Sequence, residues 1–167
     1  MQYSIDQFKA CCRYIAEEEE NLADQITMID ISNFLCLSSP SFDSIGGHSS
    51  SPLQSTLERK VLEFQQKEKE LKAKQQIIDL FLSAIEEFDE NYQIDIMQVY
   101  MIADDDGKRN CISRQARKYH IDRHSFAKEI DDAISDALKK KEVTDCMDRI
   151  KQIATDYSFR RCVAALS

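Results

Sequence analysis

The segment CISRQARKYHIDRHSFAKEIDDAISDAL, residues 111–138, decides the fold. Ser113 has the short polar side chain of a helix N-cap, so it is expected to begin a first helix that ends at Tyr119. Asp122 has the same property and is expected to begin a second helix that ends near Leu138. The two residues between these helices leave room only for a tight turn.

The predicted helix-turn-helix covers residues 112–134. His120 stands at the turn position where glycine is usual, and it is tolerated there if its backbone enters the left-handed region. The spacing of apolar residues predicts which side chains the two helices bury. The predicted inner positions are Ile112, Ala116, Tyr119, Ile121, Phe126, Ile130 and Ala133. The predicted exposed positions at the start of the second helix are Arg123, His124, Ala127 and Lys128.

Two long heptad patterns precede this motif and predict nearly continuous helices over residues 5–36 and 55–88. The stretch between them, residues 38–54, contains both prolines and two of the three glycines, so it is predicted to be a loop. The apolar seams can pack against each other as an antiparallel hairpin or against a second chain as a dimer, and the sequence leaves both open. Polar residues interrupt the seams at Glu19, Asn33, Glu68 and Gln75.

The remaining pattern adds a short apolar helix over residues 94–102 and one further helix within residues 139–167. Three glycines, two prolines and no tryptophan offer little material for a β-sandwich or barrel, whereas helix-forming residues are abundant. The sequence therefore predicts an all-α protein. Residues 1–90 form an acidic coiled-coil helical hairpin, and residues 91–167 form a small helix-turn-helix bundle with a C-terminal helix.

The charge is distributed unevenly along the chain. The net charge is −8, but residues 1–107 hold 21 acidic and 8 basic side chains, whereas residues 108–167 hold 9 acidic and 14 basic ones. Within residues 108–128, seven basic side chains face a single acidic one, Asp122. Because phosphates attract such a local surplus, this segment alone is suited to contact nucleic acid.

The motif resembles the region-4 helix-turn-helix of bacterial sigma factors and their phage relatives. The residues that carry the resemblance are Ala116, Tyr119, His120, Ile121, Asp122, Arg123, His124, Ser125 and Phe126. The wider order of elements over residues 3–138, with Tyr100 before the motif, resembles the ArpU-type regulators of prophages in Gram-positive bacteria. The resemblance implies a transcription regulator that binds promoter DNA. It does not account for residues 139–167, and the acidic Asp104–Asp106 stretch departs from the family pattern.

In helix-turn-helix proteins the second helix enters the major groove, so each cation has an expected role. Arg123 is expected to bond bidentately to guanine, while His124 and Lys128 reach bases or phosphates nearby. The first helix is expected to hold the DNA backbone through Arg114, Arg117 and Lys118. The alternative is that these cations form only a solvated basic face on a three-helix fold.

The other sequence signals predict absences. Cysteines at positions 11, 12, 36, 111, 146 and 162 match no zinc-ligand spacing, so they are expected to be free thiols, and no metal or cofactor is expected. No nucleophile has a base at a usable spacing and no glycine loop suits phosphate, so enzyme activity is not expected. No apolar run is long enough to span a membrane, and the polar N-terminal residues favour a cytoplasmic location.

Two functions fit these features. The first is a phage or prophage transcription regulator that binds double-stranded DNA, contacts RNA polymerase through its acidic hairpin, and forms a homodimer if the seams pair between chains. The second is an inhibitor of a host protein, similar in kind to an anti-CRISPR, in which the acidic hairpin is the docking surface.

Overall fold

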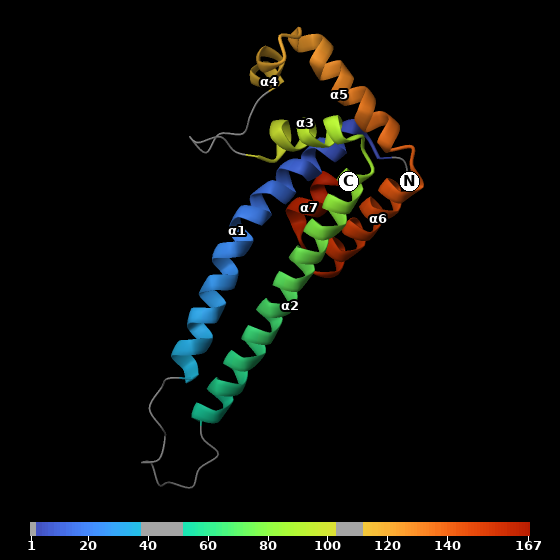
Figure 1. Ribbon diagram of the computed structural model, residues 1–167. Helices are drawn as coiled ribbons and strands as arrows, with labels where there is room; N and C mark the ends of the chain where they lie inside the picture. The colour runs from blue at the N-terminus through green and yellow to red at the C-terminus, as the bar shows by residue number, and fades with distance from the viewer. Residues whose placement is uncertain (1–2, 38–51, 103–111) are drawn as a thin grey trace.

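The computed structural model describes residues 3–37, 52–102 and 112–167, and throughout these ranges every regular element is a helix (Figure 1). The all-α prediction is therefore confirmed. The helices are α1 (Ile5–Leu37), α2 (Pro52–Glu86), α3 (Glu90–Tyr100), α4 (Ile112–Lys118), α5 (Arg123–Ala137), α6 (Lys141–Asp156) and α7 (Arg160–Ala165). Helix α2 begins at Pro52, inside the predicted loop, because proline is favourable in the first turn of a helix.

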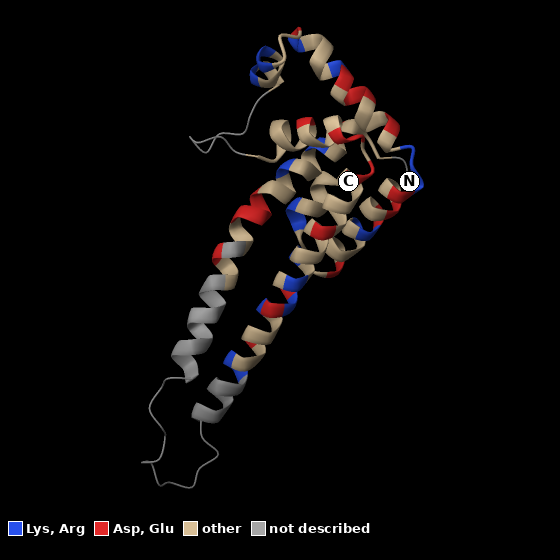
Figure 2. Cartoon of the chain, viewed as in Figure 1, with Lys and Arg blue, Asp and Glu red and all other residues tan. Residues whose placement is uncertain are grey.

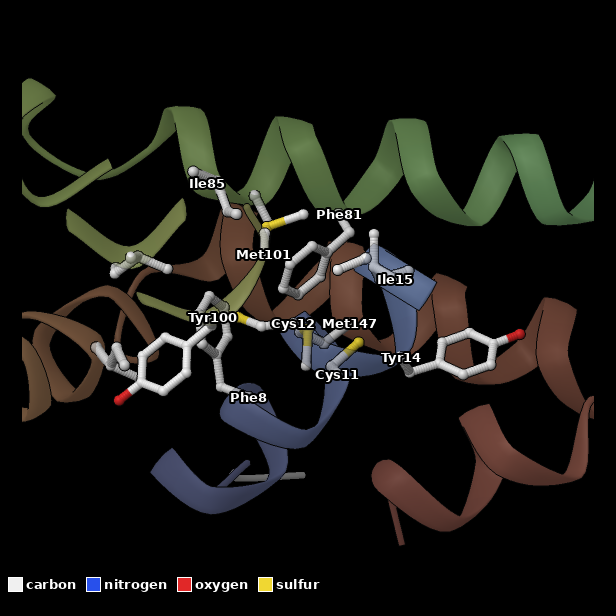
Figure 3. Packing of buried hydrophobic residues seen from close by; sticks show 14 of the residues in the cluster. Phe8, Cys11, Cys12, Tyr14, Ile15, Phe81, Ile85, Tyr100, Met101 and Met147 are labelled. Atoms are coloured by element: carbon white, nitrogen blue, oxygen red, sulfur yellow. The ribbon is translucent and has the colours of Figure 1, made fainter. Parts of the chain in front are cut away.

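The core lies where the first half of α1 and the second half of α2 meet the C-terminal helices. Helix α2 packs mainly along α6, while α1 packs against both α2 and α7 (Figure 1). An aromatic cluster occupies the centre of this core, with the ring centroid of Phe8 5.3 Å from that of Phe81 and 5.5 Å from that of Phe88. Figure 3 shows Phe8, Phe81 and Met147 converging from α1, α2 and α6.

The apolar seams predicted for α1 and α2 account for only some of the residues that these helices bury. Near the core, α1 and α2 bury residues outside the predicted seams, such as Cys11, Ile77 and Phe81, because α6 and α7 cover further faces of these helices. Farther from the core, the heptad spacing places Ile26 of α1 and Val61 of α2 on the apolar seams and so predicts that they are buried. They are 45% and 52% exposed, so this prediction is wrong. The side chains of residues 27–37 and the loop residues 38–51 lie outside the described residues.

Side chains close the ends of these helices. The Ser4 hydroxyl accepts from the Gln7 amide at 3.2 Å, and the Gln7 side chain accepts from the Ser4 amide at 2.8 Å. This reciprocal pair is a capping box, which satisfies two amides at the start of α1. At the end of α2, the Gln93 side-chain amide donates to the carbonyl oxygens of Glu86 and Phe88 at 3.1 and 2.6 Å. Helix α2 thus ends at Glu86, two residues before the predicted end at residue 88.

The single C-terminal helix predicted within residues 139–167 is wrong, because the chain forms α6 and α7 instead. Helix α6 ends where Ser158 adopts a left-handed backbone, with a φ of 59°. The amide of Phe159 donates to the carbonyl of Ala154 and that of Ser158 to the carbonyl of Thr155, which is the Schellman arrangement. This break turns α7 back against α1 and buries Cys162.

The described cysteines behave as small apolar residues. Cys11, Cys12 and Cys162 are buried, and burial raises the pKa of each thiol, that of Cys162 to about 12. Cys36 lies in α1 without a described side chain, and Cys111 lies outside the described residues. Across the part of the chain that the structure describes, no group of three potential metal ligands gathers, and no helix has the length and apolarity to span a membrane.

The aromatic cluster is expected to dominate stability. Phe8 is fully buried, so Phe8→Ala should lower the free energy of unfolding by about 3–5 kcal/mol, through lost transfer energy and the cavity left behind. Val61→Ala, at an exposed apolar position of α2, should change it by less than about 0.5 kcal/mol. Urea denaturation followed by circular dichroism measures both. Equal effects of the two substitutions would contradict this description of the core.

Candidate nucleic-acid interface

The turn between α4 and α5 has the geometry that the sequence predicted. His120 adopts the left-handed backbone conformation with a φ of 56°, and the described residues include no glycine that could take this role. The amide of Ile121 donates to the carbonyl of Ala116 at 2.9 Å, and that of His120 to the carbonyl of Arg117 at 3.2 Å. These bonds form a Schellman motif, so α4 is closed in the same way as α6.

Asp122 caps α5, as predicted. Its carboxylate accepts hydrogen bonds from the amides of His124 at 2.9 Å and Ser125 at 3.1 Å. These hydrogen bonds, led by the one from Ser125, lower the pKa of Asp122. The carboxylate also occupies the amides that would otherwise attract a phosphate to this helix end. The predicted cap at Ser113 is wrong, because α4 begins at Ile112 and Ser113 lies within its first turn.

The inner face of the motif is confirmed in part. Ala116, Phe126 and Ile130 are buried, and Ile112 and Ala133 are half-buried. The sequence did not predict Gln115, only 4% exposed, because amphipathic patterns assign glutamine to the surface.

Tyr119 and Ile121 are each 40% exposed, so their predicted burial is wrong. The Tyr119 ring lies at the edge of the motif, 5.8 Å from the ring of Phe126, and a hydrogen bond with Asp95 of α3 raises the pKa of its hydroxyl. Tyr119 therefore lies at the exposed edge of the motif, against Phe126, instead of filling the space between α4 and α5.

All six predicted contact residues are exposed and lie at one end of the molecule. Arg114, Arg117 and Lys118 project from α4, with the Lys118 ammonium 5.7 Å from the centre of the Tyr119 ring. The α5 residues are Arg123, His124 and Lys128. Figure 2 shows the positions of basic residues along α4 and the first turns of α5, at the end of the molecule away from the distal ends of α1 and α2.

The second half of α5 has the opposite charge. Glu129, Asp132 and Asp136 line a cleft of about 240 Å³ together with acidic residues from the turn after α2. Those residues are Glu87 and Asp89. Lys140 also lines this cleft, but the acidic residues outnumber it, so a polyanion is attracted more to the first two turns of α5 and to α4 than to the cleft. The charge of α5 thus changes from basic in its first two turns to acidic in its second half.

Comparison of the chain with known protein families, characterised proteins and solved structures finds no significant match.

The left-handed turn residue makes a direct prediction about stability. His120→Gly should raise the free energy of unfolding by about 1 kcal/mol, because glycine adopts a positive φ without the steric conflict of a Cβ atom. His120→Val should lower it, because a β-branched residue is least compatible with this conformation. Thermal and urea denaturation of the two variants measure the difference. A stabilising valine would show that residue 120 does not need a left-handed backbone.

The cap at Asp122 predicts a dependence on pH. Its pKa is lowered in the folded state, so the carboxylate stabilises the fold above its unfolded pKa of about 3.9, and this stabilisation disappears as pH falls through the lower folded value. Asp122→Ala should therefore reduce the melting temperature near pH 7, and the gap to the wild type should close below about pH 4. Asp122→Asn, which retains a capping oxygen, is the control. A gap that is independent of pH would contradict the role of the carboxylate.

Proposed function

We propose that the protein binds double-stranded DNA through α4 and α5 and regulates transcription. The observation that carries this proposal is the exposure of cations on both helices of a helix-turn-helix, at one end of a molecule whose net charge is −8. A basic patch on such a motif is the electrostatic footprint of a DNA-binding protein. The acidic second half of α5 supports the same orientation, because it leaves only the basic end of the helix able to enter a groove.

The residues divide into two roles in this proposal. Arg123 and His124 lie at the start of α5 and meet base edges in the major groove, with Lys128 one turn farther on. Arg117 and Lys118 on α4 hold phosphates, together with Arg114. Phosphate contacts supply most of the affinity, whereas base contacts supply the preference for a sequence.

The resemblance to sigma region 4 and to prophage regulators extends the proposal to a partner. The exposed acidic residues Glu19, Glu20 and Asp24 would remain accessible when α4 and α5 are on DNA, since this part of α1 extends away from α4 and α5 (Figure 2). RNA polymerase is the partner that the resemblance implies. A homodimer through the distal parts of these helices is the second assembly that the exposed seam residues Ile26 and Val61 allow.

The alternative, an inhibitor that acts through the acidic hairpin, has less support. Glu17 and Glu18 do not form a free acidic surface, because they pair with Arg161 of α7 and Lys74 of α2, the latter at 2.6 Å. These two carboxylates therefore serve the fold. Glu19, Glu20 and Asp24 remain exposed on α1 and would have to carry such an interaction.

Substitutions in the full chain separate base contacts from phosphate contacts. Arg123→Ala should weaken binding to a selected duplex by about 1–3 kcal/mol and relax the preference at one base pair. Lys118→Ala should weaken selected and scrambled duplexes alike and reduce the slope of log K against log salt by roughly one. Lys60→Ala, on the exposed distal part of α2, is the matched control and should change neither. Fluorescence anisotropy with labelled duplexes over a range of salt concentrations measures all three.

A different result of the binding experiment would contradict the proposal that the protein binds DNA. If the wild-type chain binds no duplex even at low salt, while it captures a host protein after nuclease treatment, the protein is an interaction module and the DNA-binding proposal is wrong.

A further inference from the structure

We infer that Lys9, Tyr100 and Asp131 form a clamp that sets the orientation of α5 for reading DNA, so that Lys9 and Asp131 are positioning residues. This inference rests on the proposed function. The three side chains come from α1, the end of α3 and the middle of α5, and they meet where the helix-turn-helix joins the rest of the fold.

The clamp is a partly buried ion pair supported by an aromatic ring. The Lys9 ammonium pairs with the Asp131 carboxylate, and these side chains are only 17% and 38% exposed. The same ammonium lies 5.9 Å from the centre of the Tyr100 ring. Burial lowers the pKa of Lys9 less than the contacts with Asp131 and Tyr100 raise it, so the ammonium stays charged. Burial also raises the pKa of Tyr100, so its hydroxyl stays neutral.

An ion pair constrains α5 in a way that its apolar contacts do not. Ile130 and Ile134 are fully buried beside Asp131, but apolar burial is proportional to area and tolerates small rotations or slides of a helix. A charged pair loses its partner when the helix turns, and an unpaired charge in a partly desolvated place is costly. The pair therefore selects one rotation and one height of α5 against α1.

Because of the position of Asp131 along α5, the orientation that the ion pair sets affects the residues proposed to contact bases. Asp131 follows Arg123 by eight residues, which is about 12 Å along a helix axis. A tilt of about 10° at Asp131 would move Arg123 by roughly 2 Å, and a hydrogen bond tolerates only about 0.5 Å of change in length. Base contacts at the start of α5 thus depend on a clamp two turns away. Phosphate contacts depend on it less, because long flexible cationic side chains still reach phosphates after a small tilt.

Electrostatics alone predicts the opposite effect, which makes the inference testable. Asp131→Asn removes a negative charge from the helix that approaches DNA, so a simple charge effect would tighten binding to any duplex. The clamp predicts that binding to a selected duplex weakens about tenfold, the loss of one base contact, while binding to a scrambled duplex is unchanged or tighter. Asp132→Asn is the matched control, because it removes the same charge from the next, exposed residue.

The experiment uses the full chain and two labelled duplexes, one selected from a random pool with the wild type and one of scrambled sequence. The readout is the ratio of the two affinities, measured at a temperature where circular dichroism shows each variant folded. Asp131→Asn and Lys9→Met should each lower this ratio about tenfold, and Asp132→Asn should leave it unchanged. The exchanged pair, Lys9→Asp with Asp131→Lys, should recover most of the ratio because the attraction is restored in the same place.

The outcomes distinguish this inference from the function on which it rests. A wild-type chain that selects no duplex would overturn the proposed function. A wild-type preference that survives Asp131→Asn, or an exchanged pair that folds without recovering the ratio, would overturn the clamp alone. If Asp131→Asn does not fold, Lys9→Met provides the same test, and a folded Lys9→Met chain with the wild-type ratio would overturn the clamp as well.

Discussion

The whole fold depends on the second half of α2, which is buried on two of its faces. Helix α1 covers one side of it and α6 covers another, so Phe81 and Ile77 lie in the middle of the core instead of along a narrow seam. Burial of apolar surface is the main source of stability, and this arrangement concentrates it at one end of the long helices. The other end, at Ile26 and Val61, contributes little to that core.

This core also provides the platform for the basic end of the molecule. Helix α1 contacts α3 and α5 at its beginning and α7 farther along, so one helix connects the C-terminal helices to the helix-turn-helix. Helix α4 packs mainly against α3 and α5. The orientation of the cationic surface is thus decided by residues distant in sequence, chiefly those on α1.

Charge is separated in space as well as in sequence. The basic side chains of α4 and early α5 form one end, acidic residues line the cleft at the other end of α5, and mixed charges cover α2. Some of the acidic surplus serves the fold, since Glu18 pairs with Lys74 and Tyr3 donates to Asp148 at 2.6 Å. A count of charges along the sequence cannot distinguish such internal pairs from an exposed charged surface that is able to bind another molecule.

The sequence by itself determined the local features of this protein. Helix-forming composition determined the all-α class, and short-range chemistry determined the cap at Asp122 and the left-handed turn at His120, because these involve neighbouring residues only. Tertiary structure decided the rest. It decided that α6 and α7 cover α1 and α2, that Tyr119 is exposed, and that Lys9 meets Asp131. Those outcomes depend on which helix faces compete for the same apolar surface, and periodicity within one helix carries no information about its partner.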